Sequence, residues 1–144
     1  MRVAWAVVVP LLALMLTGCR DVSPAGPAAS MVRPVRAVAS AADFEALRGQ
    51  PRPLVLVLTD SRHGCGCDTV LPLVDDVAVA YKDRVTFVRA DDDESVGHGL
   101  SIRYGGQILG EPWLVFFDRD GTPVQRIVMF NQAEVTAILD HLLD

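Results

Sequence analysis

The feature that most constrains the fold is an unbroken run of five aliphatic residues, LVLVL, at positions 54–58. A strand with one face in water carries a polar residue at every second position, and this run carries none. We therefore expect a strand that is buried on both faces. Such burial requires other elements above and below the sheet, and 144 residues suffice for one domain of this kind together with a targeting segment.

Strand-like and helix-like patterns alternate along the rest of the chain. Further strands are predicted over residues 32–38, 84–90, 113–117 and 122–129. Helices are predicted over residues 40–48, 67–81 and 131–142, with one short helix around residues 100–104. Strand–helix–strand units pair their strands in parallel, whereas the last two strands, joined by a tight turn, must be antiparallel. The predicted fold class is therefore α/β, a central mixed sheet flanked by helices on both faces.

Capping residues mark where several of these helices begin and end. Ser40 and Asp43 resemble a capping box with Asp in place of Glu, and Gly49 ends the helix that they open. Asn131 is the predicted N-cap of the last helix. The helix over residues 67–81 has apolar side chains at three-and-four spacing, and it contains Pro72, which is expected to kink it.

The first 18 residues have the pattern of a targeting segment. Arg2 precedes an apolar run over residues 3–16, which is shorter than the roughly 20 residues of a membrane span and is interrupted by Pro10. The run leads into the tetrapeptide LTGC, which ends at Cys19 and resembles the bacterial lipobox. The resemblance implies cleavage before Cys19 and attachment of acyl chains such as palmitate to this residue. The alternative is an ordinary secretory signal with an unmodified Cys19.

The chain is thereby divided into a lipoprotein signal peptide over residues 1–18, a lipid-anchored flexible tether over residues 19–33 and a folded domain over residues 34–144. We expect an extracytoplasmic protein on a bacterial membrane, in the periplasm or on the outer cell surface. The net charge of −5 provides no attraction to nucleic acid or to anionic lipid heads. We therefore expect no nucleic-acid partner, a membrane contact through the lipid anchor, and a monomer.

Three local features of the domain occur together. The first is the apolar strand followed by a loop, by Cys65-Gly66-Cys67, and by Pro72 five residues later. The second is the sequence GEPW, residues 110–113, ahead of a hydrophobic strand. The third is the terminal hairpin and helix. Together these features resemble the thioredoxin superfamily over residues 35–143, and Pro112 matches the family's cis-proline. The resemblance implies a thioredoxin-like fold, with a redox-active cysteine pair and with Pro112 in the loop that faces it.

The cysteine motif departs from the family pattern, which is W-C-x-x-C. When the two are aligned on Pro72, Cys67 takes the second cysteine position and Gly64 takes the first. The first cysteine is therefore displaced inward to Cys65, which gives C-x-C. The family's buried acid falls on Leu58, so the usual proton acceptor is missing, although Asp60 is close in sequence.

A C-x-C pair closes a small and strained disulfide ring, and Gly66 supplies the backbone freedom that such closure requires. Strain raises the reduction potential and makes the disulfide a better oxidant or isomerising agent. A helix N-terminus and a protonated His63 would both stabilise a thiolate. We expect Cys65 to attack and Cys67 to resolve the mixed disulfide, while the backbone at Pro112 pairs with a substrate strand.

The predicted activity is thiol–disulfide exchange, either as an oxidoreductase or as an isomerase. Its substrates would be protein or small-thiol disulfides. A redox partner of unknown identity would recycle the cysteine pair. No cofactor beyond this dithiol would be needed. An inert bridge is disfavoured because a ring this small contributes little stability.

Two other classes of function stay open. One is a copper-binding or metallochaperone protein, because His63, Cys65, Cys67 and His98 offer ligands suited to Cu(I) or Zn. Membrane-anchored copper chaperones of the Sco type share the thioredoxin-like fold and use two cysteines and a distant histidine. The other class is a non-catalytic thioredoxin-like interaction domain. Residues 91–94, DDDE, are expected to be a solvated loop at a strand end, and Trp113 is expected to be either a substrate platform or part of the core.

Overall fold

The computed structural model describes residues 34–62, 67–105, 112–128 and 130–144, with Cys67 and Asp68 described by their backbone alone. The elements in these parts of the chain are β1 (Arg36–Ala37), α1 (Ala41–Arg48), β2 (Leu54–Thr59), α2 (Cys67–Tyr81), β3 (Thr86–Asp91), α3 (Ser95–Leu100), the π-helix η1 (Ser101–Gly105), β4 (Trp113–Phe117), β5 (Pro123–Val128) and α4 (Gln132–Leu143). Among the described residues, no helix combines the length and the apolar character needed to cross a membrane.

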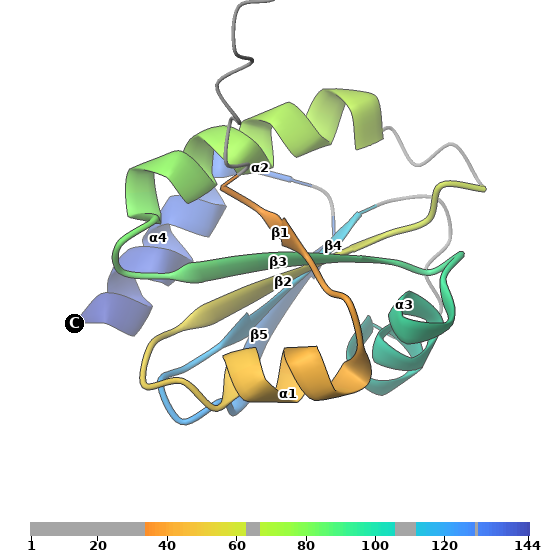
Figure 1. Ribbon diagram of the computed structural model, residues 1–144. Coiled ribbons are helices and arrows are strands. Elements are labelled where there is room, and N and C mark those ends of the chain that lie inside the picture. Colours follow the sequence, from red (N-terminus) through yellow and green to blue (C-terminus); the bar gives the residue numbers. More distant parts are fainter. Residues whose placement is uncertain (1–33, 63–66, 106–111, 129) are drawn as a thin grey trace, which may run out of the picture. The chain divides into compact units, whose positions relative to one another are not determined.

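The five strands form one mixed sheet in the order β1-β3-β2-β4-β5 (Figure 1). Strand β3 pairs in parallel with β1 and with β2. Strand β4 pairs antiparallel with β2 on one side and with β5 on the other. Both predictions of strand direction are confirmed, because the strand–helix–strand units are parallel and the terminal hairpin is antiparallel. The fold class is α/β, as predicted.

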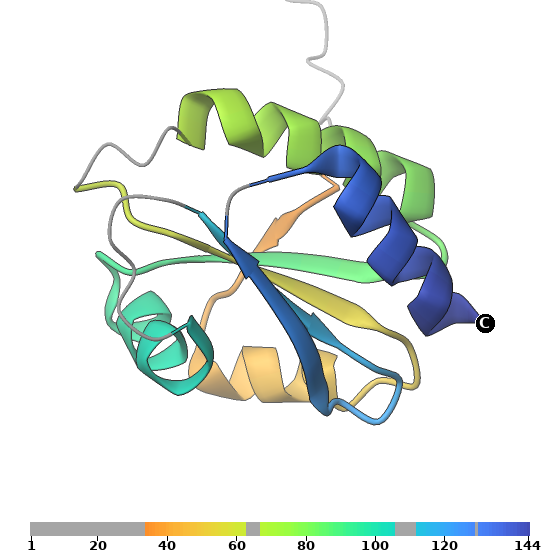
Figure 2. The same ribbon diagram turned by 180° about the vertical axis from the view of Figure 1, so that it is seen from behind.

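Strand β2 is the centre of the sheet, and all six of its residues are buried. Its side chains alternate between two apolar clusters. Val55 and Val57 pack with residues of α2 and α4, whereas Leu54, Leu56 and Leu58 pack with residues of α1 and α3. Figures 1 and 2 show these two pairs of helices on opposite faces of the sheet. Helices cover both faces of β2, which explains the uninterrupted aliphatic run and confirms the prediction of a strand buried on both faces.

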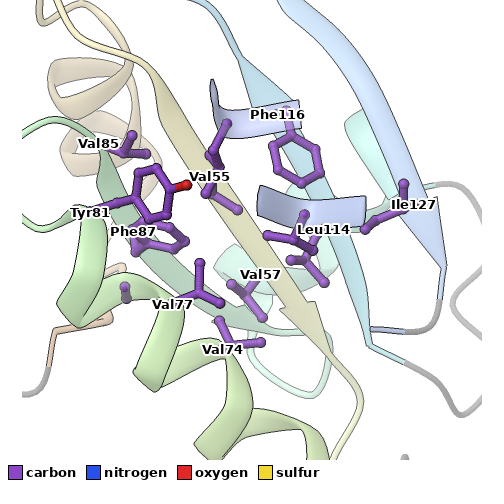
Figure 3. Close-up of a cluster of buried hydrophobic side chains, with 13 residues drawn as sticks. Val55, Val57, Val74, Val77, Tyr81, Val85, Phe87, Leu114, Phe116 and Ile127 are labelled. Atoms are coloured by element: carbon purple, nitrogen blue, oxygen red, sulfur yellow. The ribbon is translucent and has the colours of Figure 1, made fainter. Parts of the chain in front are cut away.

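The cluster on the α2 and α4 face is built from one stripe of each helix (Figure 3). Helix α2 contributes Val74, Val77, Ala78 and Tyr81, and α4 contributes Val135 and Leu139. These positions follow the three-and-four spacing that predicted both helices. Pro72 lies inside α2 on an exposed position, away from this stripe.

Tyr81 also joins α2 to α4 through its hydroxyl, which donates a hydrogen bond of 2.7 Å to Asp140 Oδ1. Burial, assisted by this bond, raises the pKa of Tyr81 above its ordinary value. The folded state therefore keeps a proton that the unfolded chain loses near pH 10, so this group's contribution to stability is complete below about pH 10 and declines above it.

We expect Tyr81→Phe to lower the free energy of unfolding by about 1 kcal/mol at neutral pH, because one hydrogen bond is lost. The variant should also lose less stability than the wild type between about pH 9 and 11, since it lacks the group that titrates. Urea unfolding at several pH values measures both effects. Tyr104→Phe is the matched control, because the buried hydroxyl of Tyr104 has no hydrogen-bond partner among the described residues. Equal losses of unfolding free energy in Tyr81→Phe and Tyr104→Phe would contradict a stabilising hydrogen bond between Tyr81 and Asp140.

Both predicted N-caps are confirmed. The Ser40 hydroxyl accepts a hydrogen bond of 3.0 Å from the Asp43 backbone N–H. The Asp43 carboxylate reaches back to the backbone N–H of Ala39, one residue before the N-cap, at 3.1 Å. The Asn131 side chain accepts hydrogen bonds from the backbone N–H groups of Ala133 and Glu134 at 3.1 and 3.4 Å. The two helices therefore begin where the sequence predicted.

Two predicted elements differ in the structure. The first strand is shorter than predicted and spans only Arg36–Ala37, although residues 32 and 33 lie outside the described part of the chain. The short helix begins five residues earlier than expected, because α3 starts at Ser95 and continues into η1. Glycine disfavours a helix by propensity, which is why the sequence did not indicate α3. Close packing on β3 decides otherwise, because a Cβ on Gly97 would lie 1.7 Å from the backbone oxygen of Asp91.

Candidate active site

Three strands meet at the end of the sheet where the cysteine motif follows β2. Thr59, the last residue of β2, is paired with Asp91, the last residue of β3. On its other side β2 runs antiparallel to β4, with Leu58 opposite Trp113, the first residue of β4. Pro112 directly precedes β4 and is buried. The register therefore places Pro112 beside the strand end from which the chain runs to the cysteines.

The structure describes only part of the predicted cysteine site. Cys67 is the first residue of α2, so the longest helix of the domain begins at the motif (Figure 1). His63, Cys65 and Gly66 lie outside the described residues, as does the Glu111–Pro112 peptide bond, so the match of Pro112 to the family's cis-proline is not tested. Roles for Cys65, Cys67 and Pro112 therefore stay predictions.

A buried carboxyl stands at this strand end. Leu58, at the position of the missing family acid, has no exposed surface. Asp60 follows β2 two residues later and is only 1 % exposed, and its Oδ1 accepts a hydrogen bond of 3.1 Å from the backbone N–H of Arg62. In the described part of the chain, Asp60 is the one charged residue that is buried to this degree. A buried ionisable group costs free energy unless it is paired or hydrogen-bonded, and the bond from Arg62 meets this need. Asp60 is therefore a buried, hydrogen-bonded acid at the strand end from which the chain runs to the cysteines.

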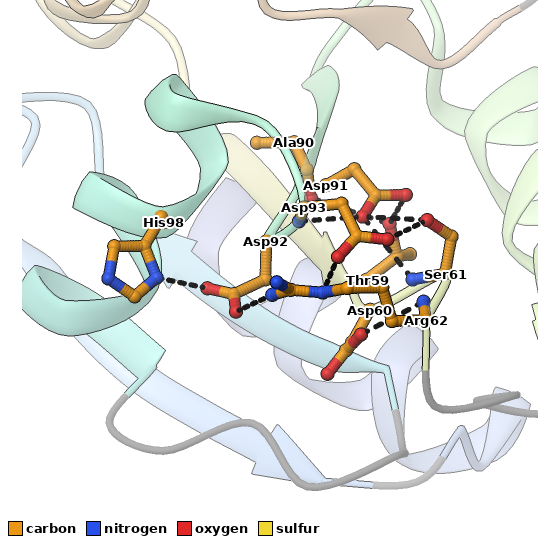
Figure 4. A network of polar contacts seen from close by, with 9 residues as sticks. All are labelled: Thr59, Asp60, Ser61, Arg62, Ala90, Asp91, Asp92, Asp93 and His98. Carbon is orange, nitrogen blue, oxygen red and sulfur yellow. Dashed lines mark hydrogen bonds and ion pairs between the residues drawn. The ribbon is translucent and has the colours of Figure 1, made fainter.

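The two residues that follow Asp60 are tied to the acidic run after β3 (Figure 4). The Ser61 backbone N–H donates a hydrogen bond of 3.3 Å to Asp91 Oδ1, and the Ser61 hydroxyl donates to Asp93. The Arg62 guanidinium forms ion pairs with Asp92, at 3.4 Å, and with Asp93. These bonds hold the segment that leads into the cysteine motif against the neighbouring strand. We call this group of residues, Ser61, Arg62, Asp91, Asp92 and Asp93, the acid clamp.

The expectation that residues 91–94 form a solvated segment at a strand end holds in part. Asp93 and Glu94 are exposed, as expected, whereas Asp91 and Asp92 are partly buried, and the side chain of Asp92, which pairs with Arg62, is only 14 % exposed. The signal was present in the topology, since Ser61 and Arg62 follow one parallel strand and the aspartates follow the next. Carboxyl ends of adjacent parallel strands lie side by side, which brings the two segments together.

His98 lies beside the acid clamp, on α3. Its Nδ1 is 3.3 Å from Asp92 Oδ1, and its side chain is 61 % exposed. No group of three or more histidine, cysteine or acidic residues among the described positions is arranged to hold a metal ion. The other three proposed ligands, His63, Cys65 and Cys67, have no described side chains. The metal-binding alternative is therefore not supported by a described site and stays a prediction.

Trp113 lies between the core and the surface. It is half-buried and packs against the cluster on the α1 and α3 face. The guanidinium carbon of Arg126 lies 4.8 Å from the centre of its indole ring, which is the distance of a cation–π contact. The core interpretation is thus confirmed in part, and the role of substrate platform stays a prediction.

A shallow hollow of about 570 Å³ opens at the opposite end of the sheet. It is lined by residues of α4 and of the β4–β5 hairpin, among them Asp118, Gln125 and His141. Asp118 follows the last residue of β4, so the hollow and Pro112 lie at opposite ends of that strand. The hollow therefore takes no part in the candidate site.

Comparison with known proteins supports the fold through structure alone. No protein-family model and no curated sequence matches the chain. Solved structures do match, and they include a Fasciola hepatica thioredoxin that is 25 % identical, with a TM-score of 0.62 over 74 % of this chain and 98 % of that one. Thioredoxin O2 from Arabidopsis thaliana, in its oxidized state, is 22 % identical with a TM-score of 0.62 over 79 % and 98 %. A mutant thioredoxin from Halobacterium salinarum is 17 % identical with a TM-score of 0.64 over 78 % and 94 %.

The sheet order, the helices on its two faces and these structural matches define an α/β domain of the thioredoxin-like superfamily. More particularly, it has a thiol–disulfide oxidoreductase-like fold, in which the helix that follows the central strand begins at Cys67.

Proposed function

We propose that this protein is a membrane-anchored, extracytoplasmic thiol–disulfide oxidoreductase or isomerase that uses Cys65 and Cys67. The observation that carries the proposal is the start of α2 at Cys67, next to the strand end where β2 and β4 bring Pro112. A helix N-terminus favours negative charge, so this position stabilises a thiolate over a thiol.

The exchange proceeds in two steps. The Cys65 thiolate attacks one sulfur of the substrate disulfide; the substrate S–S bond breaks, a mixed disulfide with Cys65 forms, and one substrate thiolate leaves and takes up a proton. The Cys67 thiolate then attacks the Cys65 sulfur, which releases the second substrate thiolate. Two electrons and two protons have passed from the dithiol to the substrate, and Cys65 and Cys67 remain as a disulfide. An isomerase takes the two electrons back from the same substrate as a new substrate disulfide forms, whereas an oxidoreductase regains them from a thiol partner.

Asp60 is our candidate for the proton acceptor of the pair. The family position for this acid is occupied by the fully buried Leu58, so the proton of the cysteine pair needs an acceptor from another position at the same strand end. Asp60 is buried there and is held through the backbone of Arg62. The acid clamp holds the next two residues, Ser61 and Arg62, at the end of β3.

Turnover of a protein disulfide tests the proposal. The full chain in detergent should accelerate the reduction of a protein disulfide by a small dithiol. The variant with both Cys65→Ser and Cys67→Ser should proceed at the rate of buffer alone. A wild-type chain that gives only the buffer rate would contradict the proposal.

The lipid anchor has its own test. Cells that express the full chain should incorporate a tagged palmitate into the protein and retain it in the membrane fraction, because two or more acyl chains give stable anchoring. Cys19→Ser should lose both the label and the membrane retention. Cys65→Ser, as the matched control, should keep both. Labelling that survives Cys19→Ser would contradict the anchor.

A further inference from the structure

One arginine contacts both described ends of the segment that carries Pro112. From β5, the Nη1 of Arg126 donates hydrogen bonds to the backbone oxygens of Gly105, at 3.1 Å, and of Tyr104, at 3.4 Å. These two residues end η1, immediately before the segment. The guanidinium carbon of the same side chain lies 4.8 Å from the ring centre of Trp113, which immediately follows Pro112.

The sheet register explains how Arg126 reaches these groups. Arg126 is paired with Val115, and Trp113 is paired with Val128, so Arg126 and Trp113 are diagonal neighbours on one face of the β4–β5 hairpin. The last carbonyls of a helix have no partner within the helix and need donors from elsewhere. A guanidinium presents several donors in a plane and also stacks on aromatic rings, so it satisfies both needs at once.

We infer that Arg126 is a positioning residue that fixes Pro112 for pairing with a substrate strand. This inference rests on the proposed function, in which the backbone at Pro112 binds the substrate next to the cysteines. Among the described residues, the hydrogen bonds and the cation–π contact of Arg126 involve η1 and Trp113 and neither α2 nor the acid clamp. Its loss should therefore weaken the binding of extended substrates and leave the dithiol itself unchanged.

The chain offers a matched control in the same hairpin. Arg119 also donates a hydrogen bond to a backbone carbonyl, that of Leu143, at 2.7 Å. It lies in the turn between β4 and β5, at the opposite end of β4 from Pro112. Arg119→Ala removes the same kind of contact and the same charge, but among the described residues this hydrogen bond joins the turn to the end of α4 and not to η1 or Trp113.

The experiment uses the full chain in detergent with two substrates, oxidised glutathione and an extended peptide that carries a mixed disulfide with glutathione. We expect Arg126→Ala to raise the KM for the peptide about fivefold, which is the typical net effect of one hydrogen bond. The kcat for the peptide and the rate with oxidised glutathione should not change. Arg126→Lys should restore part of the loss, because a lysine keeps the charge and one donor. Arg119→Ala should match the wild type throughout.

Hydrogen exchange provides a readout that does not depend on activity. Arg126→Ala should speed amide exchange at Gly105 and Trp113 and leave α2 and α4 unchanged, since only the contacts of Arg126 with η1 and Trp113 are lost. An active wild type with an Arg126→Ala variant of unchanged KM or unchanged exchange would overturn the inference alone. A wild type without disulfide exchange would overturn the proposed function and, with it, the role of Arg126 in substrate binding.

Discussion

Gly97→Ala should lower the free energy of unfolding by about 3 kcal/mol, because it forces a side-chain atom into packed backbone. The added Cβ would lie 1.7 Å from the Asp91 oxygen and 2.3 Å from the Asp91 carbonyl carbon. Backbone atoms cannot rotate away as a flexible side chain can, so α3 must move off the end of β3. Asp91 is also part of the acid clamp, and the variant should therefore loosen the segment that leads to the cysteines.

Gly99→Ala is the control for this prediction, because it lies in the same short helix. A Cβ on Gly99 meets nothing within 4 Å. Alanine favours a helix over glycine by about 1 kcal/mol, so Gly99→Ala should be neutral or stabilising. Urea unfolding of both variants, monitored by circular dichroism, measures the difference. A Gly97→Ala protein as stable as Gly99→Ala would show that α3 does not pack on β3 as described.

Serine substitutions at Cys65 and Cys67 should separate two chemical roles. Cys67→Ser leaves the attacking thiol in place and removes the resolving one, so a mixed disulfide with the substrate should accumulate on Cys65. Cys65→Ser removes the attacking thiol, and exchange should fall about a thousandfold or more, as it does when an enzyme loses its nucleophile. Mass spectrometry of the protein after incubation with a peptide disulfide identifies the trapped species.

The outcomes of the serine experiment are distinct. A trapped adduct on Cys67 in the Cys65→Ser protein would reverse the two roles. Full exchange by either single variant would contradict a mechanism that needs both thiols. Cys19→Ser is the control for a cysteine outside the motif, and it should leave the exchange rate unchanged once the proteins are compared in detergent.

Most of the fold follows from local patterns in the sequence. The aliphatic run of β2, the three-and-four spacing of α2 and α4, and the caps at Ser40 and Asn131 each determine an element by themselves. The physical causes are burial on both faces for β2, burial of one stripe for α2 and α4, and hydrogen bonding of free backbone groups for the caps. Each of these requires particular residue types at particular spacings, so the sequence indicates them directly. The topology then follows because parallel units and a terminal hairpin leave few arrangements.

The elements that the sequence did not predict depend on contacts between distant residues. Helix α3 forms despite two glycines because Gly97 allows close contact with β3. Arg62 finds its partners thirty residues away, at Asp92 and Asp93, and nothing local indicates this pairing. Arg126 likewise reaches η1 and Trp113 only through the register of the β4–β5 hairpin. For the candidate site, the sequence indicated Cys65, Cys67 and Pro112. The structure added the acid clamp, the contacts of Arg126, and the burial of Asp60.

Redox equilibration of the full chain tests the central claim most directly. The protein is brought to equilibrium in a series of glutathione buffers, its free thiols are alkylated, and the products are counted by mass; in the lipidated chain the sulfur of Cys19 is blocked, so two thiols report. Cys65 and Cys67 should lose their thiols together in one two-electron transition, in which a tenfold change in the equilibrium constant corresponds to about 30 mV. The midpoint should be less negative than the roughly −270 mV of thioredoxin, because the C-x-C ring is strained. Two thiols that stay free in fully oxidised buffer, or that form only separate adducts with glutathione, would contradict a redox-active Cys65–Cys67 pair.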